Sequence, residues 1–214
     1  MSREAKVLLA ILVVVVGGMI ALFALTGANK PAPITAKDSS KLIKDTSHKT
    51  DTGSVQIVEF GDYQCPACGA AYPVTKQLLD QEKGAITFYF RNFPLSMHAN
   101  AKVAAYAAEA AAKQNKFWEM HDKLYETQSE WSDLSNDQAI AKFSDYAASI
   151  EGMNIDQFRT DEASQMIKDI VSADQSDGEA LGVSSTPTFY VNGQQASDYS
   201  LDTLKGMIDD AKKK

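Results

Sequence analysis

Two cysteines three positions apart are the residues of this chain with the clearest capacity for chemistry. Cys65 and Cys68 lie in the stretch VQIVEFGDYQCPACGAAY, residues 55–72, and the sequence contains no other cysteine. Such a pair could form a structural disulfide, supply half of a metal site, or cycle between dithiol and disulfide. The elements around the pair and its compartment must decide between these chemistries.

The pair lies where a predicted strand meets a predicted helix. Residues 54–60 are β-branched and apolar and predict a buried strand, and the periodicity of residues 65–82 predicts a helix. Cys65 would then lie at the helix N-terminus, where unpaired N–H groups and the helix dipole favour a thiolate. Pro66 suits the first helical turn. Because Pro66 and Ala67 carry no charge, the helix end itself is expected to supply most of the lowering of the Cys65 pKa.

Cys68 lies one turn deeper, which predicts an exposed attacking thiol at Cys65 and a buried resolving thiol at Cys68. A structural disulfide that closes a loop of two intervening residues would stabilise the fold little. A zinc site usually needs four ligands. His98 and His121 could complete one, but their spacing forms no second ligand pair. The pattern therefore favours redox chemistry, and we expect no metal or other cofactor.

The N-terminus predicts a membrane anchor. Residues 7–28 are uncharged and mostly apolar, and about 20 such residues suffice for a helix to cross a bilayer. The run is longer than the apolar core of a typical signal peptide. Arg3 and Lys6 precede it, which predicts a cytoplasmic N-terminus at residues 1–6. A signal peptide cleaved after Ala28 is the alternative, and both interpretations place the remaining chain outside the cytoplasm, where disulfides persist.

The next segment is expected to be a flexible tether. Residues 29–53 are rich in Pro, Ser, Thr and Lys and poor in large apolar side chains. His48 falls in this segment and is expected to be solvated. Residues 54–214 have the size of one domain. The net charge of −7, without a basic stripe, argues against a nucleic-acid partner.

The remaining elements predict an α/β fold. A second strand at 85–93 is followed by helical periodicity over about 97–182, and the chain then returns to strand before a final helix from about 201 to 212. The helical block is too long for a simple crossover and is interpreted as an inserted subdomain. Asn192-Gly193 predicts a tight hairpin turn after the last long strand.

Three ordered motifs carry a family resemblance. VEFGDYQCPACGAAYP, FYFRNFPLSMHANA and GVSSTPTFYVNG resemble the DsbA-like thiol:disulfide oxidoreductases of the thioredoxin superfamily, in particular their membrane-tethered, extracytoplasmic bacterial branch. The resemblance covers residues 54–212. It implies a thioredoxin fold with a helical insertion, preceded here by one transmembrane helix, with Cys65 as nucleophile and Cys68 as resolving thiol.

The resemblance also implies a cis peptide bond before Pro187, beside the disulfide. This bond would expose the backbone of Thr186 to an extended substrate chain. The sequence alone favours trans, because only about 5–6% of X–Pro bonds in folded proteins are cis. Thr186 departs from the hydrophobic residue of the best-known periplasmic oxidase, which bears on substrate choice and redox poise.

Glu59 is a carboxylate within the apolar strand, six residues before Cys65. Burial there is costly unless its pKa rises. The side chain could point outward as an ordinary strand residue, or lie beneath Cys68 and exchange a proton with it. The family has an acidic residue at this position, which favours the second interpretation.

These observations predict an enzyme that donates the Cys65–Cys68 disulfide to reduced exported or cell-surface proteins as they fold. A membrane quinone-linked partner, DsbB-like or vitamin K epoxide reductase-like, would reoxidise it. The alternatives are an isomerase or reductase on the same scaffold and, from other classes, a tethered non-redox chaperone or a metal-binding protein. We expect a monomer, because residues 29–53 are too short and polar for a dimerisation domain.

Overall fold

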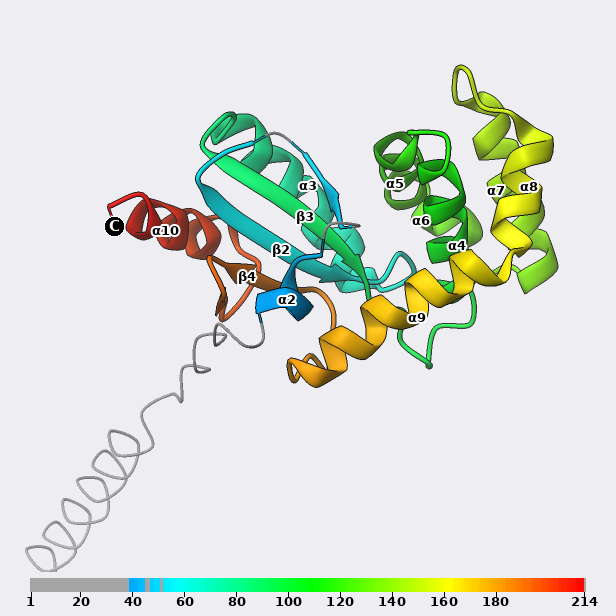
Figure 1. Cartoon of the computed structure of the whole chain (residues 1–214). Helices are drawn as coiled ribbons and strands as arrows, with labels where there is room; N and C mark the ends of the chain where they lie inside the picture. Colours follow the sequence, from blue (N-terminus) through cyan, green and yellow to red (C-terminus); the bar gives the residue numbers. More distant parts are fainter. Residues whose placement is uncertain (1–38, 45–46, 51, 214) are drawn as a thin grey trace, which may run out of the picture. The chain divides into compact units, whose positions relative to one another are not determined.

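A five-stranded mixed sheet organises the molecule. The computed structural model describes residues 39–44, 47–50 and 52–213. In this part of the chain the strand order is β1-β3-β2-β4-β5, with β2 and β3 parallel and the other neighbours antiparallel (Figure 1). The strands are β1 (His48–Lys49), β2 (Val55–Gly61), β3 (Ile86–Asn92), β4 (Thr188–Val191) and β5 (Gln194–Gln195).

The described helices fall into two groups, those beside the sheet and those inserted between β3 and β4. The first group is α2 (Ser39–Leu42), α3 (Pro66–Gln81) and α10 (Leu201–Ala211). The second is α4 (Ala101–Ala112), α5 (Phe117–Glu126), α6 (Gln128–Trp131), α7 (Asn136–Ser149), α8 (Ile155–Ala163) and α9 (Gln165–Ala180). The predicted helical insertion over about 97–182 is therefore confirmed, and α9 runs from it back to the sheet (Figure 1).

The central strand β2 is covered on both faces, because successive side chains of a strand point to opposite sides. Ile57 belongs to the core shared with α3, α10 and the inserted helices. Val58 and Phe60 belong to a second core that contains Leu42 of α2. Glu59 consequently points to the α3 face.

The inserted subdomain is built around the Ala-rich helix α4, which contacts α5, α7, α8 and α9. Alanine side chains allow four helices to approach one helix closely. Glu109 is the exception among the buried residues of α4, since it is charged and only 2% exposed. Its side chain adds a buried charge to the helix instead of apolar packing, and it contacts the chain segment that precedes β2.

The predicted hairpin at Asn192-Gly193 is confirmed. Both residues have positive φ, 45° and 79°, as a type I′ turn requires, and they join antiparallel β4 and β5. The Asn192 side chain also accepts a hydrogen bond from the Gln56 N–H at 2.8 Å. The turn is thereby tied to β2.

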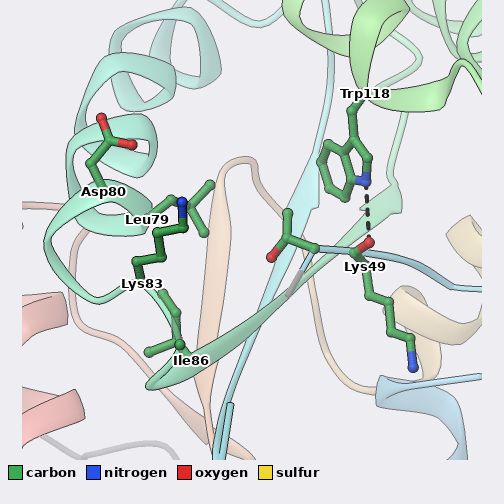
Figure 2. Close-up of a pocket in the computed structure, with 8 residues that line it drawn as sticks. Lys49, Leu79, Asp80, Lys83, Ile86 and Trp118 are labelled. Carbon is green, nitrogen blue, oxygen red and sulfur yellow. Dashed lines mark hydrogen bonds between the residues drawn. The ribbon is translucent and has the colours of Figure 1, made fainter. Parts of the chain in front are cut away.

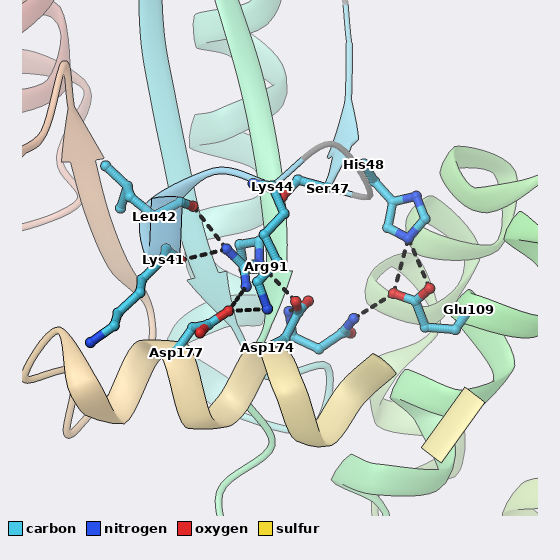
Figure 3. A network of polar contacts seen from close by, with 10 residues as sticks. Lys41, Leu42, Lys44, Ser47, His48, Arg91, Glu109, Asp174 and Asp177 are labelled. Carbon is cyan, nitrogen blue, oxygen red and sulfur yellow. Dashed lines mark hydrogen bonds and ion pairs between the residues drawn. The ribbon is translucent and has the colours of Figure 1, made fainter. Parts of the chain in front are cut away.

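The described end of the predicted tether is instead part of the folded domain. Leu42 is 5% exposed, and the carbonyls of Lys41 and Leu42 accept hydrogen bonds from Arg91 Nη1 at 2.7 and 2.9 Å (Figure 3). His48 pairs with β3 through β1, and its Nε2 lies 2.9 Å from the Glu109 carboxylate. The predictions of a tether to residue 53 and a solvated His48 are wrong here, because distant residues supply partners that composition does not reveal.

None of the helices in the described part of the chain is both long and apolar enough to span a bilayer. The predicted spanning segment, residues 7–28, lies outside the described residues and stays a prediction.

Candidate active site

Cys65 lies at the N-cap of α3, as the sequence predicts. Its carbonyl accepts the first helical hydrogen bond from the Gly69 N–H at 3.0 Å. Pro66 occupies the first turn, and Ala67 is partly buried against the core. Cys65 is only 7% exposed, so it is more covered than expected, yet it is the more accessible of the two thiols.

The Cys65 thiol is the acidic member of the pair. Its pKa is lowered from 9.0 to about 5, chiefly by the hydrogen bond from the Cys68 thiol. The Thr186 side chain and the backbone N–H groups of Cys68 and Ala67 lower the pKa further, while burial opposes them. The expectation that the helix end would dominate is wrong, because one helical turn brings a second sulfur to Cys65 and this sulfur contributes more than the amides.

Cys68 is fully buried, at 0% exposure. Burial raises the pKa of its thiol far above the usual value, and the hydrogen bond to Cys65 and the charge of Glu59 act in the same direction. The Asp62 N–H donates to Cys68 Sγ at 3.5 Å. Cys68 therefore keeps its proton while Cys65 is a thiolate, which is the asymmetry expected of a resolving and an attacking cysteine.

The Thr186–Pro187 segment lies directly against Cys65. The peptide bond between these residues is cis, as the resemblance implied. Cys65 Sγ is 3.5 Å from the Thr186 carbonyl oxygen, so the segment before β4 and the start of α3 meet at the sulfur. Thr188 fixes this segment by donating its hydroxyl to the Ser185 carbonyl at 2.7 Å.

Glu59 is buried, at 3% exposure, and not an outward-pointing strand residue. Burial raises the pKa of its carboxyl from 4.5 to about 8. The charge of Glu59 also acts on the Cys68 thiol. The structure thus places a carboxyl that holds its proton at neutral pH on the same face of the sheet as the buried sulfur.

Asp62 organises the loop between β2 and α3, a role that sequence analysis missed. One carboxylate oxygen accepts the Gln64 N–H at 2.8 Å, and the other accepts the Leu95 N–H at 2.9 Å and lies 2.7 Å from His98 Nδ1. The same residue directs its own N–H at Cys68. In the sequence, GDYQ carries only a turn signal, and nothing local points to His98.

The inserted subdomain holds the other side of this loop. Gln128 of α6 donates to the carbonyls of Tyr63 and Cys65 at 2.7 and 2.9 Å. Gln64 donates to the Ser132 carbonyl at 2.7 Å and accepts the Asn100 N–H at 2.5 Å. The loop between β2 and α3 is therefore held by both the sheet and the inserted subdomain, and both must fold to position it.

The histidines considered as zinc ligands have separate partners. His98 contacts Asp62, and His121 is a buried core residue whose Nδ1 lies 3.1 Å from the Tyr63 hydroxyl. Within the described residues, no group of three or more His, Cys, Asp or Glu side chains is arranged to hold a metal ion.

Comparisons with known proteins agree with this geometry. Residues 50–210 match the family model described as thioredoxin. The probable disulfide bond formation protein D of Bacillus cereus is 34% identical over 173 residues, a match that covers 77% of this chain and 77% of that protein. Oxidised BdbD from Bacillus subtilis superposes with a TM-score of 0.69 at 23% identity, covering 86% of this chain and 98% of BdbD. The DsbA-like resemblance of the three motifs is thereby confirmed.

A longer relative shares the same segment. The Na⁺/H⁺ antiporter NhaA 1 of Salinispora arenicola is 36% identical over 159 residues, covering 73% of this chain and 23% of the antiporter. This chain therefore spans less than a quarter of the length of that protein.

Proposed function

Since this chain belongs to the thioredoxin family, we propose that it is a thiol:disulfide oxidoreductase that donates its Cys65–Cys68 disulfide to exported proteins as they fold. The opposite behaviour of the two thiols carries the proposal. The pKa of Cys65 is lowered to about 5, whereas that of Cys68 is raised by burial. A low-pKa sulfur beside a cis-proline and a protonated, buried sulfur one turn away suit the two halves of disulfide exchange.

The exchange proceeds in two steps. A substrate thiolate attacks Cys65 Sγ, the Cys65–Cys68 bond breaks, and Cys68 leaves as a thiolate that takes the Glu59 proton while the Asp62 N–H remains directed at its sulfur. A second substrate thiolate then attacks the substrate sulfur of the mixed disulfide. Cys65 leaves as a stabilised thiolate, and the substrate gains one disulfide while the enzyme gains two electrons.

The acidity of Cys65 also favours the oxidising direction, because a stabilised thiolate stabilises the reduced enzyme. Thioredoxin combines a cysteine pKa near 7 with a potential of about −270 mV, and DsbA a pKa near 3.5 with about −120 mV. A pKa of about 5 lies between them. Interpolation predicts a reduction potential of about −180 mV.

The test is to equilibrate the full chain, purified in detergent, with glutathione buffers and to follow reduced-protein oxidation in parallel. We expect a potential of about −180 mV or higher, and loss of all oxidase activity in Cys65→Ser. A potential of about −250 mV or lower would instead indicate a reductase. If Cys65→Ser keeps its oxidase activity, the attacking cysteine is misassigned, and if client protection survives loss of both cysteines, a chaperone is the better description.

The cellular setting is part of the proposal and is supported by the sequence. Residues 7–28 would anchor a monomer in the cell membrane, with residues 1–6 in the cytoplasm and the catalytic domain outside. A membrane quinone-linked partner would return the electrons. Protease added to intact spheroplasts should digest the domain, whereas protection of the domain would contradict this topology.

A further inference from the structure

Asp62 contacts both active-site cysteines through its backbone. Its carbonyl accepts the Cys65 N–H at 3.1 Å, and its N–H donates to Cys68 Sγ at 3.5 Å. The first contact holds the N-cap of α3. Under the proposed function, the second contact meets the sulfur that leaves when a substrate thiolate attacks Cys65. The orientation of this one residue therefore bears on both halves of the disulfide.

The Asp62 N–H is directed at a sulfur whose surroundings otherwise oppose a negative charge. Burial, the hydrogen bond to Cys65 and the charge of Glu59 raise the pKa of the Cys68 thiol, whereas the Asp62 N–H lowers it. Hydrogen bonds to ionised acceptors are stronger than those to neutral acceptors, so this contact strengthens as Cys68 becomes a thiolate. The N–H can stabilise the leaving sulfur only while the Asp62 backbone keeps its orientation.

The Asp62 carboxylate is anchored inside the protein by three donors. The side chain is fully buried, at 0% exposure. The N–H groups of Gln64 and Leu95 donate to its two oxygens at 2.8 and 2.9 Å, and His98 Nδ1 lies 2.7 Å from the oxygen that Leu95 contacts. Because an ionised carboxylate can only accept, Nδ1 carries the hydrogen. Among these three donors, His98 contributes a side chain and makes the shortest contact.

His98 is held in the loop between β3 and α4 by contacts of its own. Its N–H donates to the Leu95 carbonyl at 3.1 Å, and its carbonyl accepts the N–H of Ala101, the first residue of α4, at 3.3 Å. The neighbouring Asn100 side chain donates to the Leu134 carbonyl at 2.9 Å. The imidazole is 18% exposed, so it lies at the margin of the buried region. The fold thus sets the donor in place before any substrate arrives.

The Cys65 end of the loop has a separate support. Gln128 of α6 donates to the Cys65 carbonyl at 2.9 Å. Loss of the His98 contact would therefore free the Asp62 side chain while Cys65 stays in place. This separation predicts that His98 affects the Cys68 sulfur with little change at Cys65.

We propose that His98 is a positioning residue of disulfide exchange, which acts on the Cys68 sulfur by holding Asp62. When a substrate thiolate forms its bond to Cys65 Sγ, the Cys65–Cys68 bond breaks and Cys68 takes the electron pair. The Asp62 N–H stabilises the growing charge, and His98 keeps that N–H on the sulfur through the carboxylate. His98 neither gains nor loses a proton, so atoms and electrons balance as in the exchange itself.

The test follows the two cysteines separately in the full chain, purified in detergent. Reduction of the oxidised protein by dithiothreitol, with acid quenching and mass spectrometry of alkylated thiols, reports the step in which Cys68 leaves. Iodoacetamide alkylation of the reduced protein reports Cys65. We expect His98→Leu to slow reduction by about 5-fold or more, the effect of one lost hydrogen bond on a rate. Alkylation of Cys65 should stay within about 2-fold of the wild type.

His98→Asn is the matched variant, because the asparagine amide can place an N–H where His98 has Nδ1. We expect it to restore reduction to within about 2-fold of the wild type. In an Asp62→Ala background, which lacks the acceptor, His98→Leu should slow reduction by less than about 2-fold further. Urea titration shows whether this background folds, and if it does not, the leucine and asparagine variants decide the question.

Two substitutions away from the Asp62 carboxylate serve as controls. Met97→Leu alters the neighbouring position in the same loop, where the side chain is 79% exposed. Lys83→Leu removes a basic side chain beyond the far end of α3, where Lys83 lines a surface pocket of about 350 Å³ with Leu79 and Trp118 (Figure 2). Both proteins should be reduced within about 2-fold of the wild-type rate.

Three results would overturn the role of His98. They are a wild-type rate of reduction in His98→Leu, an asparagine variant as slow as the leucine variant, and equal changes in the reactions that report Cys68 and Cys65. A full further slowing in the Asp62→Ala background would also overturn it, because His98 would then act by another route. Failure of the proposed function would look different, since the wild type would not transfer its disulfide to reduced proteins, whatever its rate with dithiothreitol.

Discussion

Two buried ionisable side chains on neighbouring strands differ in whether the fold supplies partners for their charge. Arg91 of β3 is fully buried and donates to Asp174 Oδ1 and Asp177 Oδ2, both at 2.8 Å, as well as to two backbone carbonyls (Figure 3). Glu59 of β2 is buried without such compensation, and its pKa rises to about 8. The paired charge of Arg91 joins α2, β3 and α9, whereas the unpaired carboxyl of Glu59 retains a proton that it can transfer.

Removal of Arg91 should cause the largest loss of stability among the substitutions that test this comparison. Arg91→Leu leaves buried Asp174 without its cation, so we expect the free energy of unfolding to fall by about 3–5 kcal/mol in urea titrations. Lys44→Ala is the control, because Lys44 also pairs with Asp177 but is partly exposed and should cost about 1 kcal/mol or less. A loss below about 1 kcal/mol in Arg91→Leu would show that the Arg91 network is not a stabilising feature.

Removal of the Glu59 carboxyl should raise the free energy of unfolding, whereas removal of Arg91 lowers it. Its pKa is 4.5 in the unfolded chain and about 8 in the fold, so the native state holds the extra proton between these values. The contribution of Glu59 to the stability of the reduced protein therefore falls by about 1.4 kcal/mol per pH unit from about pH 4.5 to 8 and is level above. Cys65, whose pKa is lowered from 9.0 to about 5, contributes in the opposite direction in both the wild type and Glu59→Gln, so the difference between them isolates Glu59. Glu59→Gln lacks this slope and should be about 3 kcal/mol more stable than the wild type at pH 7, with little difference near pH 4.5.

Urea titrations of both proteins across this pH range measure the difference. Parallel stability curves for wild type and Glu59→Gln would mean that the carboxyl is hydrated in solution, and the contrast with Arg91 would then disappear.

His48 tests how far the compensated network extends. His48→Phe should retain the stacking on Phe117, whose ring centroid is 3.5 Å away, but it removes the contact with Glu109. Glu109 would keep only Asn92 Nδ2, at 2.7 Å, so we expect a loss of about 1–2 kcal/mol. An unchanged unfolding midpoint would mean that β1 contributes no stability through this contact.

Substitution of Tyr125 should have the smallest effect on stability. Like Glu59, Tyr125 carries a buried polar group without a hydrogen-bond partner in the described structure. Its hydroxyl has no partner within the described structure, so Tyr125→Phe should leave stability unchanged or raise it by up to about 1 kcal/mol. Tyr63→Phe, which loses the bond to His121, should instead be destabilised by about 1 kcal/mol. Equal losses in thermal or urea unfolding would indicate that Tyr125 is hydrogen-bonded after all.

Several features of the site were predictable because their signals are local. The positions of Cys65, Pro66 and Cys68 follow from the junction of an apolar strand with a helical periodicity. Asn192-Gly193 predicts its hairpin because a type I′ turn requires positive φ at both central residues, and Asn and Gly are among the few residue types that adopt it readily. The cis bond before Pro187 required the family resemblance, since most X–Pro bonds are trans and the sequence alone carries no signal for cis.

By itself, then, the sequence determined the α/β order, the helical insertion and the placement of two thiols on one helical turn, since periodicity and turn chemistry act over a few residues. Only the tertiary structure decided which partners those residues meet. Cys65 with Thr186, Asp62 with His98 and Arg91 with Asp174 are joined across separations of 121, 36 and 83 positions. Such contacts depend on how the chain packs, and so the strength of the Cys65 acidity and the docking of residues 39–44 and 47–50 could not be foreseen.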